Sequence, residues 1–194
     1  VGSEMCIRDR HYDVIVINDG SKDNTRVICE ENNIPIINLV QNLGIGGAVQ
    51  TGYKYAYDHD YDYAIQYDGD GQHEISCAKD ILNPLKENNA DLVVGSRFID
   101  KNSSKFKSSV ARRIGIKIIS NLIKLTTGKR IYDVTSGFRA ANKNIIKRFA
   151  YSYPLEYPEA VTNAELLKNG LNVLEVPVSM HERETGESSI HTWK

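Results

Sequence analysis

The amino-acid sequence predicts an α/β fold, in which a mostly parallel, doubly wound sheet carries helices on both faces. Short apolar runs, typical of strands that are buried on both faces, alternate along the chain with segments of helical periodicity. The main apolar runs end abruptly in polar residues and glycines, as at 19–21 and 68–71. Because ligands of open α/β sheets bind outside the carboxyl ends of strands, we expect the functional site at these strand ends.

Length and composition indicate one globular domain. The chain has 194 residues, of which 41% are hydrophobic, and a formal net charge of -1. We interpret residues 1–10 as a leader and residues 11–194 as the domain. The near-balanced charge gives no sign of a nucleic-acid partner, and no apolar run is as long as a membrane span, so we expect a cytoplasmic protein. Cys6, Cys29 and Cys77 are widely spaced, which predicts reduced thiols.

The first elements predict a β-α-β-α order. The apolar run 13–18 predicts a strand, Ser21 or Asp23 is suited to cap a following helix, and strand character resumes at 36–40. A glycine-rich turn at 42–48 leads into the next helix. Its spacing is not that of the G-x-G-x-x-G fingerprint. We therefore expect these glycines to permit close approach of backbone, to the sheet or to a ligand, rather than to hold a pyrophosphate.

The remaining elements continue this alternation. Strands are predicted at 61–67, 91–95 and 172–180, and helices around 81–84, 110–128, 145–149 and 166–167. Gly170 is suited to end the last of these helices. The segment 133–139 contains small polar residues, one acid and one arginine, and we interpret it as a turn.

The most informative stretch is Asp68-Gly69-Asp70-Gly71-Gln72-His73, which follows the strand predicted at 61–67. The hard oxygens of Asp68 and Asp70 suit Mg²⁺ or Mn²⁺, and the glycines let backbone approach a ligand. An ordinary Asp-Gly turn between strand and helix is the alternative interpretation. The residues alone leave both open.

A basic amphipathic helix is predicted at 110–128. No acidic residue occurs from 101 to 130, and apolar residues recur there at helical spacing. The stripe comprises Ile114, Ile118, Leu122 and Leu125, widened by Ile119 and Ile123. One interpretation packs this stripe on the domain and leaves a solvated basic face. The other has the helix meet anionic lipid or a phosphorylated acceptor, which would place the protein at the inner face of a membrane.

Taken together and in order, these motifs resemble the inverting family-two nucleotide-sugar glycosyltransferases of the GT-A fold. Within that family the sequence is most similar to the dolichyl- or polyprenyl-phosphate mannosyl- and glucosyltransferases. The resemblance runs from about 13 to 189. It rests on VINDGSKDNT at 16–25, NLGIGGA at 42–48, DGDGQH at 68–73, GSRF at 95–98, TSGFR at 135–139, EVPV at 175–178 and RETGES at 183–188.

The resemblance implies a role for particular residues. It implies a nucleotide-binding part at about 11–100 and an acceptor part at about 101–194. By the same resemblance Asp19 contacts the nucleobase, Asp68 contacts the ribose and the metal, and Asp70 and Gln72 bind the metal. Positions that face phosphates or the acceptor are Arg97, Arg139, Arg183 and Ser188.

The chemistry expected of such a site follows from its residues. Breaking the bond between an anomeric carbon and a nucleoside diphosphate develops negative charge, which a divalent ion at Asp68 and Asp70 and a guanidinium such as Arg97 would stabilise. A lipid-phosphate acceptor is already an anion and needs no general base. A sugar hydroxyl on a glycan acceptor does need one, and Glu159 is the first candidate, with Asp133 second. A scaffolding role is the alternative for both acids.

Both ends of the chain depart from the family pattern, and at the second end the sequence stops at Trp193-Lys194, where members of the family often continue. The family normally opens with a strand that ends in a Pro-x-Tyr-Asn-Glu-like segment, which residues 1–12 do not match. We therefore expect the first strand to be missing and this chain to turn over donor more slowly than a longer form. A non-catalytic or incomplete nucleotide-sugar-binding domain is the alternative function.

Overall fold

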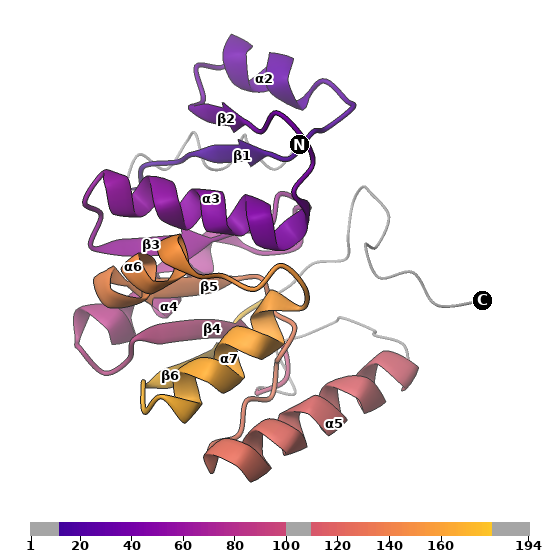
Figure 1. Ribbon diagram of the computed structural model, residues 1–194, viewed down its shortest axis with the longest axis vertical. Coiled ribbons are helices and arrows are strands. Elements are labelled where there is room, and N and C mark those ends of the chain that lie inside the picture. The colour runs from indigo at the N-terminus through magenta and orange to yellow at the C-terminus, as the bar shows by residue number, and fades with distance from the viewer. Residues whose placement is uncertain (1–11, 100–109, 180–194) are drawn as a thin grey trace.

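The computed structural model describes residues 12–99 and 110–179, with backbone alone at 110–112 (Figure 1). Strands and helices alternate along most of this length. The strands are β1 Val16–Asn18, β2 Ile36–Asn38, β3 Tyr63–Gln66, β4 Leu92–Ser96, β5 Arg139–Asn142 and β6 Val173–Pro177. The helices are α2 Thr25–Glu31, α3 Gly44–Asp58, α4 Ala78–Lys86, α5 Val110–Thr127, α6 Lys143–Tyr151 and α7 Pro158–Lys168, with a 3-10 turn at Ile75–Cys77. The leader predicted at 1–10 lies outside the described residues.

The α/β class is confirmed, but the sheet is mixed rather than mostly parallel. Within the described residues β1 pairs with β2 in parallel, and a second sheet has the order β3-β5-β4-β6. Strand β6 runs parallel to β4, whereas β5 is antiparallel to both β3 and β4. The sequence did not predict β5, since its residues Arg-Ala-Ala-Asn include no β-branched or aromatic side chain.

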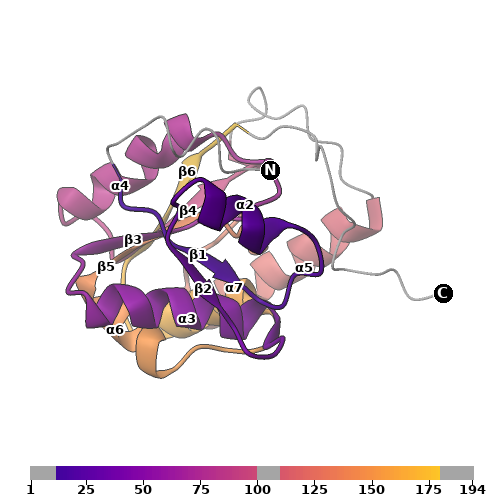
Figure 2. The ribbon, with the colours of Figure 1, turned by 90° about the horizontal axis from the view of Figure 1, so that it is seen from above.

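Small residues suit β5 to the centre of the sheet. Ala140 and Ala141 are fully buried on opposite faces of the strand. Ala140 joins the core that α4 covers, together with Leu85 and Phe138. Ala141 joins the core beneath α3 and α6, together with Tyr53 and Phe149. Helices therefore cover both faces of the sheet, as predicted, with α4 on the side away from α3 and α6 (Figure 2).

The glycine-rich turn at 42–48 permits close packing of backbone, as predicted, but at Gly46 the partner is another loop rather than the sheet or a ligand. Helix α3 begins at Gly44, and a Cβ added at Gly46 would lie 2.6 Å from the Cα of Leu155. Backbone of the segment after α6 thus passes directly over the first turn of α3. Before α2, Asp23 Oδ1 accepts a hydrogen bond from the Thr25 N–H at 3.0 Å, although Asn24 is the N-cap residue.

Helix α5 is present as predicted, but most of its apolar stripe faces outward, whereas Ile123 is buried. Ile116, Ser120 and Ile123 are the buried positions, and the helix packs beside α7. Leu125 is 83% exposed, and three further apolar residues of the stripe are each 54% exposed, namely Ile114, Ile118 and Leu122. The interpretation that packs this stripe on the domain is therefore wrong for these residues. Figure 1 shows α5 standing at the side of the body, away from the strands.

Candidate functional site

The antiparallel direction of β5 brings three loops to one edge of the sheet. Arg139, the first residue of β5, is in register with Gln66 on β3 and with Val94 on β4. The segment that precedes β5 therefore meets the segments that follow β3 and β4. These segments contain Asp133, Asp68 and Arg97, so residues far apart in the sequence share this edge.

Asp68 lies directly against the backbone of Gly137. A Cβ added at residue 137 would lie 2.8 Å from both Cγ and Oδ1 of Asp68. The glycine of the TSGFR motif is thus required so that the carboxylate can take this position. The sequence offers a glycine there but no local sign of which side chain would use the space.

Asp70 and Gln72 form a tight turn. Asp70 Oδ1 accepts a hydrogen bond from the Gln72 backbone N–H at 3.1 Å, and Gly71 has a φ of 71°, in the left-handed region. Both acids are half-buried at the end of β3. The turn interpretation and the ligand interpretation of this motif are therefore compatible, since the turn itself presents the two carboxylates.

The chemistry of this donor set fits a divalent metal that arrives with a phosphate ligand. Within residues 12–99 and 110–179 no group of three or more His, Cys, Asp or Glu side chains could hold a metal alone. Mg²⁺ commonly binds through one or two carboxylates, with substrate phosphates and water completing its shell. Asp68 and Asp70 could supply those carboxylates, and Gln72, in the same turn as Asp70, could supply an amide oxygen.

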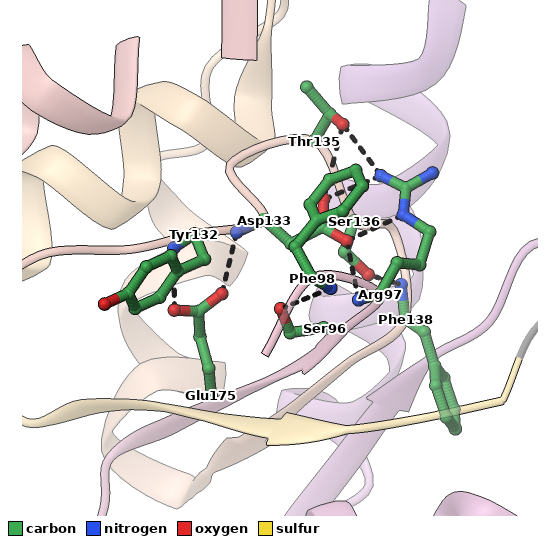
Figure 3. A network of polar contacts seen from close by, with 9 residues as sticks. All are labelled: Ser96, Arg97, Phe98, Tyr132, Asp133, Thr135, Ser136, Phe138 and Glu175. Atoms are coloured by element: carbon green, nitrogen blue, oxygen red, sulfur yellow. Dashed lines mark hydrogen bonds and ion pairs between the residues drawn. The ribbon is translucent and has the colours of Figure 1, made fainter. Parts of the chain in front are cut away.

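Arg97 and Asp133 form a buried ion pair (Figure 3). Asp133 accepts from Arg97 Nε and Nη2 at 2.6 Å each and from the Arg97 backbone N–H at 3.0 Å. Arg97 Nη2 also donates to Thr135 Oγ1 at 2.8 Å. Asp133 is fully buried, and Arg97 is 5% exposed. This burial and pairing do not favour Asp133 as a general base, because a base needs access to the proton it removes.

Glu175 on β6 holds the backbone that carries Asp133. Its carboxylate accepts from the backbone N–H groups of Tyr132 and Asp133 at 2.7 Å each (Figure 3). Burial raises the pKa of Glu175, and these two hydrogen bonds oppose the rise. Sequence reasoning missed this residue. The signal was an acid within the otherwise apolar strand Val173–Pro177, since a charge at such a position needs a partner.

His73 closes the inner side of the acidic turn. It is 4% exposed, packs against Phe138 at a centroid distance of 4.9 Å, and its Nδ1 has no hydrogen-bond partner. Burial lowers the pKa of His73 to about 4. The imidazole is therefore neutral near pH 7 and acts as an aromatic packing group against Phe138 and Tyr67.

Arg139 turns inward rather than toward the ligand edge. Its guanidinium is fully buried and donates to Thr162 Oγ1 at 2.8 Å, to the Asn163 side chain and to the Glu159 carbonyl at 3.4 Å. A phosphate cannot reach these donors while α7 covers them. The burial of Arg139 thus speaks against the direct contact with phosphate or acceptor that the family resemblance implies. Glu159 itself lies half-buried in the first turn of α7.

Asp19 joins the end of β1 to the start of α3. Its Oδ1 accepts from the Leu43 N–H at 2.6 Å, and its carbonyl accepts from the Asn42 side chain at 2.8 Å. Its role toward a nucleobase remains a prediction, as do those of Arg183 and Ser188, which lie outside the described residues. A groove of about 520 Å³ between α3 and the end of α6 is lined by none of the predicted site residues.

The mixed sheet, its helical layers and the acidic end of β3 define an α/β protein of the GT-A type. The chain belongs to glycosyl transferase family 2, whose model matches residues 6–150. It is therefore a glycosyltransferase by family. It is 32% identical over 193 residues to the UDP-N-acetylglucosamine–dolichyl-phosphate N-acetylglucosaminyltransferase of Methanococcus voltae, covering 89% of this chain and 76% of that protein. It is 26% identical over 190 residues to the undecaprenyl-phosphate mannosyltransferase of Micrococcus luteus, covering 92% and 75%.

Solved structures support the same fold. The glucosyl-3-phosphoglycerate synthase of Mycobacterium tuberculosis, determined with Mn²⁺, UDP-glucose and phosphoglyceric acid, has a TM-score of 0.62 at 15% identity. The match covers 89% of this chain and 61% of that one. Residues 1–349 of Staphylococcus aureus TarS give a TM-score of 0.55 at 15% identity, over 86% of this chain and 51% of TarS. The chain thus spans about three fifths or less of the length of these structural neighbours.

Proposed function

We propose that this protein transfers a sugar from a nucleoside-diphosphate sugar to a polyprenyl-phosphate acceptor, with inversion at the anomeric carbon. The observation that carries the proposal is the pair of carboxylates Asp68 and Asp70 at the end of β3, of which Asp68 lies against Gly137, in a family-2 glycosyltransferase. The names of the Methanococcus voltae and Micrococcus luteus relatives specify dolichyl phosphate and undecaprenyl phosphate. They support a lipid-phosphate acceptor here.

In this proposal the acceptor phosphate needs no proton removed. One of its oxygens attacks the anomeric carbon, and the bond to the diphosphate breaks with its electron pair leaving on the diphosphate oxygen. Asp68 and Asp70 would hold Mg²⁺ or Mn²⁺, which when bound supplies positive charge to the leaving diphosphate. Glu159, in the first turn of α7, would serve as base only toward a hydroxyl acceptor.

Arg97 and Asp133 have a structural task in this proposal. Because Asp133 neutralises the guanidinium, the pair contributes shape rather than net charge. It fixes the 133–138 segment, which carries Gly137, against the end of β4. The nucleobase is assigned to the Asp19 side of the site, where the end of β1 meets the start of α3.

Helix α5 is assigned to the membrane surface. The described residues contain no helix long and apolar enough to cross a bilayer. The outward stripe of α5 is flanked by Arg113, Lys117 and Lys124, and helices of this kind lie in the interface of anionic membranes. This placement would bring the protein to an acceptor that is itself embedded in lipid.

Transfer can be tested with the full chain, Mn²⁺, a panel of UDP- and GDP-sugars, and a short-chain polyprenyl phosphate. We expect a glycosyl-phosphate lipid, detected by mass spectrometry, and none with the Asp70→Asn variant. Donor bound without transfer or hydrolysis would instead identify a non-catalytic nucleotide-sugar-binding domain. Transfer only to free sugars would reject the lipid-phosphate acceptor.

A further inference from the structure

Arg139 is a buried charge held by neutral groups. Its side chain is 0% exposed, and it donates hydrogen bonds to a hydroxyl, a side-chain amide oxygen and a backbone carbonyl of α7. Burying a guanidinium is costly unless its donors are satisfied, yet Arg139 Nε has no partner within the described part of the chain. A residue retained at such cost for packing alone would be better replaced by an apolar one.

The three partners lie in the first turns of α7. Thr162 Oγ1 accepts from Arg139 Nη1 and donates to the Pro158 carbonyl at 2.6 Å. Arg139 Nη2 reaches the Glu159 carbonyl directly. The guanidinium fork therefore holds Pro158 and Glu159 through two routes. Such planar, multidentate bonding is a property of arginine that lysine lacks.

The N-cap of α7 is unusual. Its N-cap residue, Tyr157, has φ 48° and ψ 46°, a left-handed conformation that is unusual for a tyrosine, and it makes no side-chain cap hydrogen bond. The tie from Arg139 instead reaches oxygen atoms in the first turns of this helix. It connects the helix to the strand position in register with Gln66, two residues before Asp68.

The contacts of Tyr153 show that the end of β3 lies near the first turn of α7. Its hydroxyl lies 3.5 Å from Gln66 Oε1. Burial raises the pKa of Tyr153 to about 12, and the charges of Arg139, Glu159 and Asp68 all act on its hydroxyl. The end of β3 and the first turn of α7 are thus neighbours, with Arg139 between them in the fold.

We propose that Arg139 is a positioning residue, which holds the first turn of α7, and with it Glu159, against the end of β3 that carries Asp68. This inference rests on the proposed function, because the position of Glu159 matters only if a sugar donor binds there. In this inference Arg139 positions protein backbone and does not contact a phosphate.

Two variants separate position from charge. Arg139→Lys keeps the charge and loses the planar fork. Asn163→Asp keeps the acceptor for Arg139, removes an amide N–H that has no partner, and neutralises the guanidinium. Arg148→Met is the matched control, because Arg148 ties α6 to α7 through Glu165 at 2.6 Å on the surface.

Positioning predicts that Arg139→Lys lowers kcat by about tenfold or more, with the donor KM changed by less than about threefold. It also predicts faster amide hydrogen exchange at 159–163 in that variant. Asn163→Asp and Arg148→Met should keep kcat within about twofold of the parent. The opposite pattern, with Arg139→Lys active and Asn163→Asp impaired, would show that the charge is what matters and would overturn the proposal.

Hydrogen exchange separates this inference from the proposed function. If the parent turns over no donor, the proposed function fails, but the exchange at 159–163 still reports whether Arg139 holds the turn. Unchanged exchange in Arg139→Lys would overturn the positioning role, whatever the activity of the parent.

Discussion

The carboxylate of Asp68 occupies the space that a side chain at residue 137 would need. An added Cβ would stand 2.8 Å from Asp68 Cγ, closer than carbon atoms pack. Two residues that are 69 positions apart in the sequence are therefore interdependent, and the glycine of one loop sets the position of the acid in another.

Gly137→Ala should move Asp68 and weaken metal-dependent donor binding by about tenfold or more, with a stability cost of about 1–3 kcal/mol from overpacking. Isothermal titration with UDP-sugar in Mn²⁺ measures the first effect and urea denaturation the second. Gly115→Ala is the control, because a Cβ there meets nothing within 4 Å. Unchanged donor affinity in Gly137→Ala would mean that Asp68 does not contact the donor or its metal.

Asp70→Asn should abolish metal-dependent donor binding and leave the fold intact. The amide oxygen still accepts from the Gln72 N–H, so the turn is preserved while a charge is lost. Thermal shift with and without Mn²⁺ checks this, and we expect the variant to lose the donor-dependent shift and keep its melting temperature. A donor-dependent shift equal to that of the parent would contradict the metal assignment of Asp70.

Arg97→Met should destabilise the protein by about 3–5 kcal/mol, because it leaves the Asp133 carboxylate buried without its partner. The double variant Arg97→Met/Asp133→Leu removes both charges and should recover much of this loss. Urea denaturation of the parent, both single variants and the double variant gives the coupling. Additive losses would show that the two side chains do not act as a pair.

Because His73 is buried, we expect the stability of the fold to decrease in acid. Burial lowers the pKa of His73 from 6.5 to about 4, although nearby Asp70 opposes the shift. Between these values the unfolded chain binds more protons than the folded one, so stability is fully present above about pH 6.5 and falls as the pH drops toward 4. The loss amounts to about 3 kcal/mol over that window.

His73→Phe keeps an aromatic ring against Phe138 and removes the titrating group. Urea midpoints measured from pH 7 to pH 4.5 should therefore fall less steeply in this variant than in the parent. Equal slopes would exclude His73 as the source of the pH dependence.

Helix α5 predicts charge-dependent binding to anionic vesicles. Reversing Lys117 and Lys124 to Glu should weaken binding, since each basic group near such a surface is worth about 1 kcal/mol. Co-sedimentation with phosphatidylglycerol vesicles measures this. The charge-matched control reverses Lys79 and Lys86, which are exposed on α4. A parent that does not sediment with vesicles, or equal losses in both variants, would reject the lipid contact.

Local patterns predicted most elements because those elements are defined locally. The apolar runs at β1, β3, β4 and β6 and the periodicity of α5 are visible within a short window of sequence. Strand β5 was not predicted, because Ala-Ala fits the crowded centre of a sheet yet has little strand preference of its own. Because β5 was not predicted, its antiparallel direction was not predicted either.

The sequence predicted which acidic residues form the candidate site but not the contacts that hold the site together. Asp68 and Asp70 could be recognised as candidates because they directly follow a predicted strand. The burial of Arg139 and the support of Asp133 by Glu175 depend on contacts between residues 20 to 43 positions apart, which no local window contains. The resemblance to a family placed Arg97 and Arg139 at positions facing phosphates or the acceptor, whereas the structure turns Arg139 inward and pairs Arg97 with Asp133.

The division of the described strands into two sheets has a mechanical consequence. No ladder hydrogen bond joins β1 and β2 to the four-stranded sheet in the part of the chain that the structure describes, and α3 packs on both β1 and β3. Asp19 therefore sits on one hydrogen-bonded piece and Asp68 on the other. The distance between them can change by a small tilt across α3 without breaking any strand pairing of the described residues. A molecule that contacted both acids would act as a clamp, drawing the two pieces together as it binds.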